Sequence, residues 1–347
     1  MTNYIGTWIC VDAVGEESIY PQTGEKSSGK KHQEIYWRCI ILFFATSRRF
    51  NKTQKHILFS NTRQIPTWKG LDVAAALIEL SVELIYTDFN YKTPKGYFNL
   101  FQNQFYEFSI LEYITKNNGN GDDHYLILDS DCIFTCAVDE LFELAKPTGF
   151  ISFEDDCKTD LIIHGLSRRD MKTLYEDLTG KNVKEIPGYH LGEFFLASVK
   201  NINTIYRDFK LLWPELMRRH EAGLPKFNEE AQTLSYIYYK NNFLASRRKD
   251  LLKRFWTNPV FYRNVEPTDV NVAIWHLPSE KTWGLADLYQ RLIVEHKQLG
   301  LGLPHFEYQD MISTTLGIPT LSNAKLVKYY VLSYYRAANK RVKKFFK

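Results

Sequence analysis

Apolar residues recur along the first half of the chain with two different periods. Segments with the three- and four-residue spacing of amphipathic helices alternate with shorter runs rich in β-branched and aromatic residues, which are typical of strands. The predicted helices span residues 34–50, 70–81 and 99–117, and the predicted strands span 4–14, 55–61, 82–89 and the run from 124 to Asp129. Strands that alternate with helices indicate an α/β protein with a mostly parallel sheet.

The order of the elements changes after Asp131. Strands are predicted at 148–154 and 189–199, with a short one inside 271–285, and helices are predicted at 203–220 and 228–242. The remainder is mostly helical in pattern. We find neither an internal repeat nor a low-complexity tract, so a repeat architecture is not indicated.

The strand that begins at residue 124 ends in Asp129-Ser130-Asp131, two carboxylates separated by one residue. Asp and Ser are common turn formers, so a turn is one interpretation. A metal site is the other, because in an extended chain both carboxylates would point the same way and repel each other unless a cation lay between them. The position favours the metal, since open α/β sheets bind ligands at the carboxyl ends of their strands.

A second polar group follows the apolar run VAIW, where His276 ends a predicted strand and Lys281 follows five residues later. Either residue alone could be structural or solvated. Two carboxylates and one imidazole form a mixed ligand set that suits Mn²⁺, with Mg²⁺ as the alternative. A nearby lysine would neutralise a phosphate as a point charge. A nucleoside diphosphate leaving group requires this combination.

The segment GEKSSGKK, residues 24–31, comes close to the sequence of a phosphate-binding loop. That motif needs Ser or Thr directly after its Gly-Lys pair to hold magnesium, but this position is Lys31. A polar run also separates the segment from the predicted strand before it. We therefore exclude a P-loop and predict a loop near a ligand.

Four segments, in their order along the chain, resemble a GT-A fold nucleotide-sugar glycosyltransferase. The likeness is to the retaining family of glycogenin and the lipopolysaccharide galactosyltransferases. It extends over about residues 4–285, and its segments are LILDSDCIF, GEFFLAS, NEEAQTLSYIYY and WHLPSEKTWGL. The Asp-x-Asp and the His…Lys pair are its specific parts.

The resemblance implies roles for the polar residues described above. Asp129, Asp131 and His276 would hold the metal, and Lys281 would contact the diphosphate. The chain departs from the family in the last segment: the step from His276 to Lys281 is one residue shorter, and Thr282 stands where the family has proline. The lysine role is therefore less firmly supported than the histidine role.

Three acids are catalytic candidates. Glu229 and Glu230 follow Asn228, a predicted helix N-cap, and surface acids favoured by the helix dipole are the simpler interpretation. By resemblance this position faces the sugar, so Glu229 would act as a nucleophile or stabilise an oxocarbenium-like state. Glu193 interrupts an apolar strand, which is costly unless its charge is paired or faces a cleft. In an inverting enzyme it would deprotonate the acceptor hydroxyl. The acidic segment at 153–156 is predicted to be a solvated loop.

Three further residues are candidates for the nucleotide-sugar site. Val11 and Asp12 end the opening strand and would flank the base. Asn103 lies on the helix before the metal strand, and in the GT-A plan that helix borders the nucleotide and the sugar. Ordinary turn or helix positions are the alternative for all three.

Composition and termini bear on location. With 44% hydrophobic and 24% charged residues, the chain resembles an ordinary soluble globular protein. It starts without a basic region followed by an apolar segment, so we expect no secretory signal and a cytoplasmic protein. The apolar run at 39–45 is far shorter than the ~20 residues that span a bilayer. Five scattered cysteines lack disulfide or zinc spacing, which indicates reduced thiols.

The last 26 residues hold eight Lys or Arg and no acid, although the net charge of the whole chain is only +4. A helix over 324–347 would place Leu326, Tyr330, Val331 and Tyr334 on one side. The surrounding basic residues are Lys328, Arg336, Lys340, Arg341, Lys343 and Lys344. Such a helix suits an anionic membrane surface, which predicts a peripheral protein on the inner face of the cytoplasmic membrane. The alternative is a final helix packed on the body. No other basic patch indicates nucleic acid.

We therefore predict a metal-dependent, bacterial-type glycosyltransferase of GT-A (Rossmann-like) α/β fold. It would move a sugar from a UDP-linked donor to a glycan or lipid-linked glycan, with retention favoured over inversion. The predicted catalytic domain is 1–285, with a nucleotide-sugar half at about 1–131 and an acceptor half at about 132–285, and a helical extension follows at 286–347. Two rivals are a sugar nucleotidyltransferase, whose Gly-rich amino-terminal signature is missing here, and a non-catalytic carbohydrate-binding protein, which would not need the metal ligands.

Overall fold

The computed structural model describes residues 1–17, 20–68, 71–246, 248, 250–296, 298–331 and 333–334. The contacts of the chain divide it into two compact units. The first consists of Met1–Trp37, Asn51–Ser130 and Val138–Arg247, and the second of Arg38–Phe50, Asp131–Ala137 and Arg248–Lys347. Each unit thus collects segments that are distant in sequence. These two units are defined by their internal contacts. The predicted boundary between a catalytic domain and a helical extension at residue 285 concerns function and stays a prediction.

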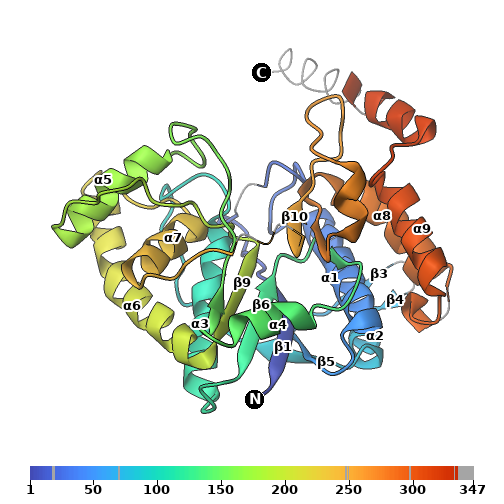
Figure 1. The fold of residues 1–347 in the computed structure, drawn as a ribbon, viewed down its shortest axis with the longest axis horizontal. Helices are drawn as coiled ribbons and strands as arrows, with labels where there is room; N and C mark the ends of the chain where they lie inside the picture. The colour runs from blue at the N-terminus through green and yellow to red at the C-terminus, as the bar shows by residue number, and fades with distance from the viewer. Residues whose placement is uncertain are drawn as a thin grey trace. The chain divides into compact units, whose positions relative to one another are not determined.

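The first unit contains a six-stranded sheet in the order β5-β2-β1-β6-β9-β8 (Figure 1). Its strands are β1 (Asn3–Ile9), β2 (Lys55–Ser60), β5 (Val82–Tyr86), β6 (His124–Leu128), β8 (Phe150–Ile151) and β9 (Phe194–Ser198). The pairs β5–β2, β2–β1 and β1–β6 are parallel, whereas β9 is antiparallel to both of its neighbours. The prediction of a mixed, mostly parallel α/β sheet is therefore confirmed.

Helices flank this sheet, and they explain the apolar strands. Every residue of β6 and β9 is buried, as expected for strands covered on both faces. The helices of this unit are α2 (Val73–Glu79), α3 (Tyr106–Asn117), α4 (Asp139–Ala145), α5 (Arg168–Thr179), α6 (Val199–Glu221) and α7 (Glu230–Lys240), with a short 3-10 turn η1 (Gln102–Phe105) before α3. The short strands β3 (Thr67–Trp68) and β4 (Leu71–Asp72) pair antiparallel. Helix α1 (Lys30–Phe50) begins in this unit and ends in the second.

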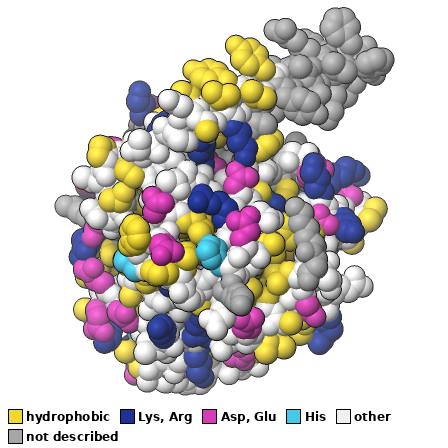
Figure 2. Space-filling model, turned by 90° about the vertical axis from the view of Figure 1, so that its right-hand side faces the viewer, with side chains coloured by type: hydrophobic (Ala, Val, Ile, Leu, Met, Phe, Trp, Pro, Cys, Tyr) yellow, Lys and Arg dark blue, Asp and Glu magenta, His cyan; other side chains and the backbone are white. Residues whose placement is uncertain are grey.

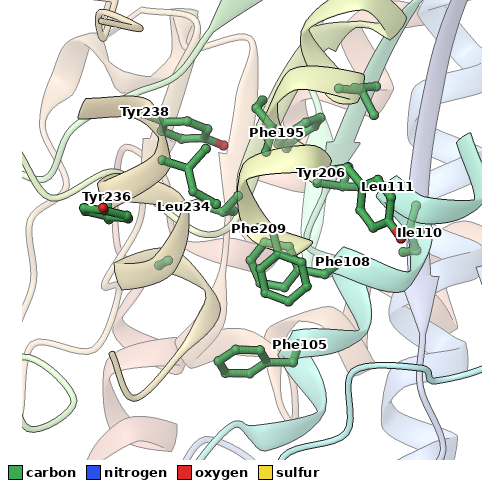
Figure 3. Packing of buried hydrophobic residues seen from close by; sticks show 14 of the residues in the cluster. Phe105, Phe108, Ile110, Leu111, Phe195, Tyr206, Phe209, Leu234, Tyr236 and Tyr238 are labelled. Carbon is green, nitrogen blue, oxygen red and sulfur yellow. The ribbon is translucent and has the colours of Figure 1, made fainter. Parts of the chain in front are cut away.

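An aromatic core joins α3, α6 and α7 (Figure 3). Phe108 of α3 and Phe209 of α6 are fully buried, and their rings stack with centroids 3.6 Å apart. Phe105 stands beside them at the end of η1, with its ring centroid 5.8 Å from that of Phe108. The abundance of aromatic residues in the sequence therefore serves packing here.

The second unit is built on a three-stranded sheet in the order β10-β11-β7. The strands are β10 (Leu252–Arg254), β11 (Ile274–His276) and β7 (Cys132–Phe134), and β11 runs parallel to β10 and antiparallel to β7. Its helical segments are η2 (Pro267–Asn271), η3 (Pro278–Glu280), α8 (Gly284–Tyr289), η4 (Gln290–Val294), η5 (Gln298–Gly300) and α9 (His305–Leu316), and a further helical stretch covers 323–331.

Two helices of the first unit were not predicted from the sequence. Helices α4 and α5 both fall in segments for which the sequence predicted no element. Helix α5 nevertheless has recognisable end signals, because Ser167 and Asp170 form a capping box and Gly180 ends it in the left-handed conformation. Among the residues that the structure describes, no helix is both long enough and apolar enough to cross a membrane.

Candidate metal and sugar site

Asp131, His276 and Lys281 meet at the sheet of the second unit. Asp131 directly precedes β7 and His276 ends β11, and these antiparallel strands place His276 opposite Cys132. The backbone N–H of Leu277 donates to the carbonyl of Asp131 at 3.1 Å. His276 was expected at a strand end, and the structure confirms that position.

Asp131 is buried between two cationic side chains. Its carboxylate oxygens lie 3.3 Å from His276 Nε2 and 3.2 Å from Lys281 Nζ, and the residue is 1% exposed. Burial alone would raise the pKa of Asp131, but the charges of Lys281 and His276 outweigh it and lower this pKa to about 2. Asp131 is therefore ionised at any physiological pH.

Asp129 directly follows β6, and its backbone N–H donates to the carbonyl of Glu193 at 3.2 Å. The chain turns at Ser130 and does not stay extended, as the metal hypothesis had assumed. Asp129, Asp131 and His276 still offer ligand atoms that all lie within 4.8 Å of one another. Opposite ligands of an ion bound at roughly 2.0–2.6 Å lie about 4–5 Å apart. The turn and the metal site are thus compatible interpretations.

The donor set fits a divalent cation. It combines two carboxylates with an imidazole, which suits Mn²⁺ or Mg²⁺. Within the described part of the chain, neither ion pair of Asp131 has the geometry of a hydrogen bond, so both of its buried carboxylate oxygens keep acceptor capacity. A buried acceptor in this state is what a metal ligand requires.

Glu107, Glu193 and Glu230 are among the buried acids of the first unit. Glu193 is 4% exposed, Glu230 is 3% exposed and Glu107 is 8% exposed. Among the described residues, Oε2 of Glu230 has no hydrogen-bond partner. Burial, followed by the negative charges of Glu229 and Glu107, raises the pKa of Glu230 well above its ordinary value. A buried acid with an oxygen that lacks a partner among the described residues, and with a raised pKa, is a candidate for a functional site, and Glu230 meets these conditions.

Glu107 was not among the predicted site residues. It lies in the first turn of α3, and its Oε1 accepts a hydrogen bond from Trp8 Nε1 at 3.2 Å. Burial and then the charge of Asp129 raise its pKa, against the effect of that hydrogen bond. The available signal was an acid inside the otherwise apolar and aromatic run YEFSIL.

Glycine allows Glu230 to approach the start of β9. A Cβ added at Gly192, which precedes Glu193, would lie 2.5 Å from Oε1 of Glu230. A side chain at residue 192 would therefore force the Glu230 carboxylate to move. The sequence pair Gly192-Glu193 thus has a steric basis.

Glu229 is engaged by two side chains that sequence reasoning missed. Tyr189 donates its hydroxyl hydrogen to Oε1 of Glu229, and Nδ1 of His164 contacts Oε2. Glu229 is 2% exposed, and it is itself the N-cap of α7, one residue after the predicted cap at Asn228. The expected position of Glu229 beside the anomeric carbon stays a prediction.

The three predicted nucleotide-sugar residues gather at the end of β1. Asn61 pairs with the backbone of Val11, accepting from its N–H at 2.7 Å and donating to its carbonyl at 2.9 Å. Asn103 donates to the carbonyl of Cys10 at 3.2 Å, and Ser27 donates to Asp12 at 2.6 Å.

A small pocket lies at this point, and aromatic side chains form part of its wall. It is lined by Trp8, Ile9, Cys10, Val11, Tyr20, Ser27, His32, Gln33, Tyr36 and Asn103. The rings of His32 and Tyr36 stack at 4.6 Å. The loop around 24–31, expected near a ligand, contributes Ser27 to the lining.

Comparison with known proteins finds similar chains among solved structures. No protein-family model and no curated protein sequence matches the chain. Among solved structures, the apo form of mouse xyloside xylosyltransferase 1 is similar to it, with 13% sequence identity and a TM-score of 0.45, over 79% of this chain and 97% of that one. At this level of similarity, the reaction has to be argued from the site itself.

Proposed function

We propose that the protein is a metal-dependent glycosyltransferase of GT-A architecture. It would transfer a sugar from a nucleoside diphosphate donor, UDP-linked by resemblance, to a glycan or a lipid-linked glycan. The observation that carries the proposal is the Asp129, Asp131 and His276 group, with Lys281 at 3.2 Å from Asp131.

Each of these residues has a task in breaking the bond between sugar and diphosphate. Negative charge on the departing diphosphate would be stabilised by a Mn²⁺ or Mg²⁺ ion held by Asp129, Asp131 and His276. Lys281 adds a positive charge beside Asp131, where it can interact with a phosphate oxygen. Asp131 keeps its ligand charge because its pKa is about 2.

The donor would lie against the first unit. We place the nucleoside base near the end of β1, where the stacked rings of His32 and Tyr36 line a pocket. The pocket has a volume of only about 10 Å³, so its side chains would have to move to admit a base. Glu193 and Glu230 would face the sugar. Resemblance favours retention through Glu229 or Glu230, and inversion with a separate base is the alternative.

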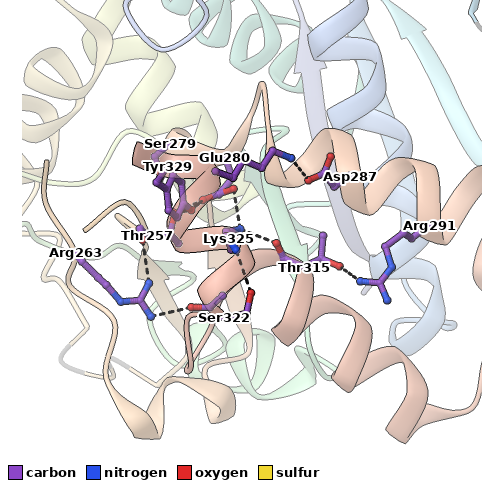
Figure 4. A network of polar contacts seen from close by, with 12 residues as sticks. Thr257, Arg263, Ser279, Glu280, Asp287, Arg291, Thr315, Ser322, Lys325 and Tyr329 are labelled. Carbon is purple, nitrogen blue, oxygen red and sulfur yellow. Dashed lines mark hydrogen bonds and ion pairs between the residues drawn. The ribbon is translucent and has the colours of Figure 1, made fainter. Parts of the chain in front are cut away.

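A peripheral position at an anionic membrane surface, on the cytoplasmic side, is part of the proposal. The stretch 323–331 is docked through one side: Tyr329 is 5% exposed, and Lys325 Nζ lies 3.2 Å from Oε2 of buried Glu280 (Figure 4). Thr257 accepts from the Tyr329 hydroxyl at 3.0 Å. The alternative of a final helix packed on the body thus applies to this side.

The opposite side of that stretch supports membrane contact. Val327, Tyr330, Val331 and Tyr334 are 49–74% exposed and recur at helical spacing. Figure 2 shows hydrophobic side chains gathered where the described chain ends. Leu326 is only half-buried, and the predicted basic residues from Arg336 onward lie outside the described residues. An apolar stripe next to a basic segment suits an anionic bilayer.

Binding of the donor nucleotide tests the proposal. UDP with Mn²⁺ should raise the melting temperature of the wild-type protein, since a ligand that binds only the native state stabilises it. Neither UDP with EDTA nor Mn²⁺ with uridine should have the same effect. Equal melting temperatures with and without UDP·Mn²⁺ would count against a nucleotide-sugar enzyme.

A further inference from the structure

We propose that His164, oriented by Glu229, is the base that takes the proton from the attacking acceptor hydroxyl. The inference rests on the proposed function and adds to it the residue that activates the acceptor. All residues involved belong to the first unit, and neither His164 nor Tyr189 was singled out by sequence or resemblance.

His164 stands at the tip of a two-residue turn. Ile163 and Leu166 exchange backbone hydrogen bonds at 2.9 and 3.2 Å, and the two residues between them, His164 and Gly165, both have positive φ angles, of 47° and 86°. This is the pattern of a type I′ turn, in which Asn-Gly is the usual pair. A histidine at this position adopts a conformation that its side chain disfavours, and such strain concentrates at functional sites.

The start of α7 fixes the turn in place. Asn228 donates to the carbonyl of His164 at 3.0 Å, and Gln232 donates to the carbonyl of Ile163 at 3.0 Å. A Cβ on Gly165 would approach Asn228 Nδ2 to 2.8 Å, so glycine is needed for this contact. The turn is therefore held against the same helix end that supplies Glu229.

The contacts of His164 are those of an oriented general base. Its Nδ1 bonds to Glu229, which fixes the ring and leaves Nε2 as the proton-accepting nitrogen. Glu229 is in turn held by the Tyr189 hydroxyl. A buried carboxylate that holds an imidazole also stabilises the imidazolium formed on proton transfer, as in hydrolase triads.

The surroundings leave His164 accessible to a substrate. Its side chain is 34% exposed while that of Glu229 is 2% exposed. The rings of Phe101 and Phe98 lie 4.9 and 6.4 Å from the imidazole, which gives the exposed edge an aromatic border. Aromatic walls with a few fixed polar groups are typical of ligand sites.

The dyad also lies within electrostatic reach of the other acids of the first unit. Glu229 is adjacent to Glu230, and burial, Glu229, Glu107 and Asp129 together raise the pKa of Glu230. The charged group that contacts the imidazole is Glu229, which also accepts from the Tyr189 hydroxyl, and Glu230 is next to it in the chain. The base therefore contacts Glu229, whose neighbour in the chain, Glu230, is one of the acids proposed to face the sugar.

The proposed step balances as a single displacement. The acceptor oxygen forms a bond to the anomeric carbon while its proton moves to Nε2 of His164. The bond from the anomeric carbon to the diphosphate oxygen breaks, and its electron pair leaves with the diphosphate. His164 later releases the proton to water. This route favours inversion over retention and replaces Glu193 as the base.

Variants of the turn test the step without removing the fold. His164→Asn keeps a residue that tolerates positive φ, and His164→Gly opens room for free imidazole. UDP release would be measured from UDP-glucose, UDP-galactose and UDP-N-acetylglucosamine with a panel of methyl glycosides and Mn²⁺. We expect both variants to lose about 100-fold or more in kcat, with an unchanged UDP·Mn²⁺ melting shift, and we expect added imidazole to restore part of the activity of His164→Gly.

Controls and partner variants separate chemistry from folding. Tyr189→Phe should reduce kcat less than Glu229→Gln, because Tyr189 only holds the carboxylate. His305→Asn, at an exposed histidine of α9, should leave kcat unchanged.

Two results would overturn the inference in different ways. Near-wild-type kcat in His164→Asn, or no imidazole rescue of an inactive His164→Gly, removes His164 as the base while the glycosyltransferase proposal stands. If the wild-type protein neither binds UDP·Mn²⁺ nor releases UDP from any donor, the proposed function fails, and the inference fails with it.

Discussion

Replacing Asp131 by asparagine should destabilise the metal-free protein as well as remove a metal ligand. Asp131 is 1% exposed and lies 3.2–3.3 Å from Lys281 and His276, which are themselves buried. Asparagine keeps the volume but not the charge, so Lys281 and His276 lose this carboxylate. Removing one partner of a buried ion pair typically costs about 3–5 kcal/mol. Because the amide can still accept one hydrogen bond, we expect about 3 kcal/mol.

Asp129→Asn is the matched control. Asp129 is only half-buried, and its negative charge contributes to the raised pKa values of Glu107 and Glu230. Its removal should therefore change the free energy of unfolding by less than about 1 kcal/mol. Both variants should abolish transfer, since each lacks one metal ligand.

Urea unfolding followed by tryptophan fluorescence, at pH 7 with EDTA, measures both effects. Asp131→Asn should lower the midpoint clearly, whereas Asp129→Asn should leave it near the wild-type value. If both variants unfold with the wild-type midpoint, the buried ion pairs of Asp131 contribute no net stability and the reasoning from burial is refuted.

Four substitutions and one deletion test the packing, the turn, a buried histidine and the proposed membrane surface. Phe209→Ala should cost about 3–5 kcal/mol, because it empties the stacked position against Phe108; a loss below 1 kcal/mol in urea unfolding would contradict that packing. Gly165→Ala should cost about 1–3 kcal/mol through its φ of 86°, and an unchanged midpoint would exclude the proposed turn. Burial lowers the pKa of His190 to about 4, below an unfolded value of about 6.5. The contribution of His190 to the free energy of unfolding should therefore be complete above pH 6.5 and fall by about 3 kcal/mol as the pH drops to 4. His190→Gln should flatten this decline, and a pH profile of stability identical to that of the wild type would contradict the reasoning. Val331→Glu should release the protein from anionic liposomes at low salt without changing its melting temperature. Deletion of 324–347 should release it and also lower the melting temperature, because Tyr329 and Lys325 are docked. A full-length protein that does not bind such liposomes would exclude the membrane surface.

The alternating pattern of strands and helices was sufficient to predict the sheet, because parallel strands buried on both faces leave continuous apolar runs. It could not predict that β9 runs antiparallel, since strand direction depends on how the chain crosses the sheet. Helix α5 was missed because few of its residues are buried, only Met171, Leu174 and Tyr175. Its capping box was the stronger signal.

The metal ligands were predictable for a related reason. Asp129, Asp131 and His276 each end or follow an apolar strand, so their position can be read from the chain. His164 and Glu229 are different, because they are 65 residues apart and meet through a two-residue turn. The pair His164-Gly165 between apolar residues was a local turn signal, but its partner could not be read from the sequence. Glu107 was hidden by its helix, whose apolar periodicity gave no reason to single out one acid.

Metal-dependent consumption of a nucleotide sugar tests the central claim most directly. The wild-type protein would be incubated with UDP- and GDP-sugars, with Mn²⁺, with Mg²⁺ or with EDTA, and release of the nucleoside diphosphate would be measured. The proposal predicts release from at least one UDP-sugar with Mn²⁺ or Mg²⁺, none with EDTA, and none from Asp129→Asn or Asp131→Asn under the same conditions. Release that persists in EDTA or in both aspartate variants, or no release from any donor by the wild-type protein, would contradict it.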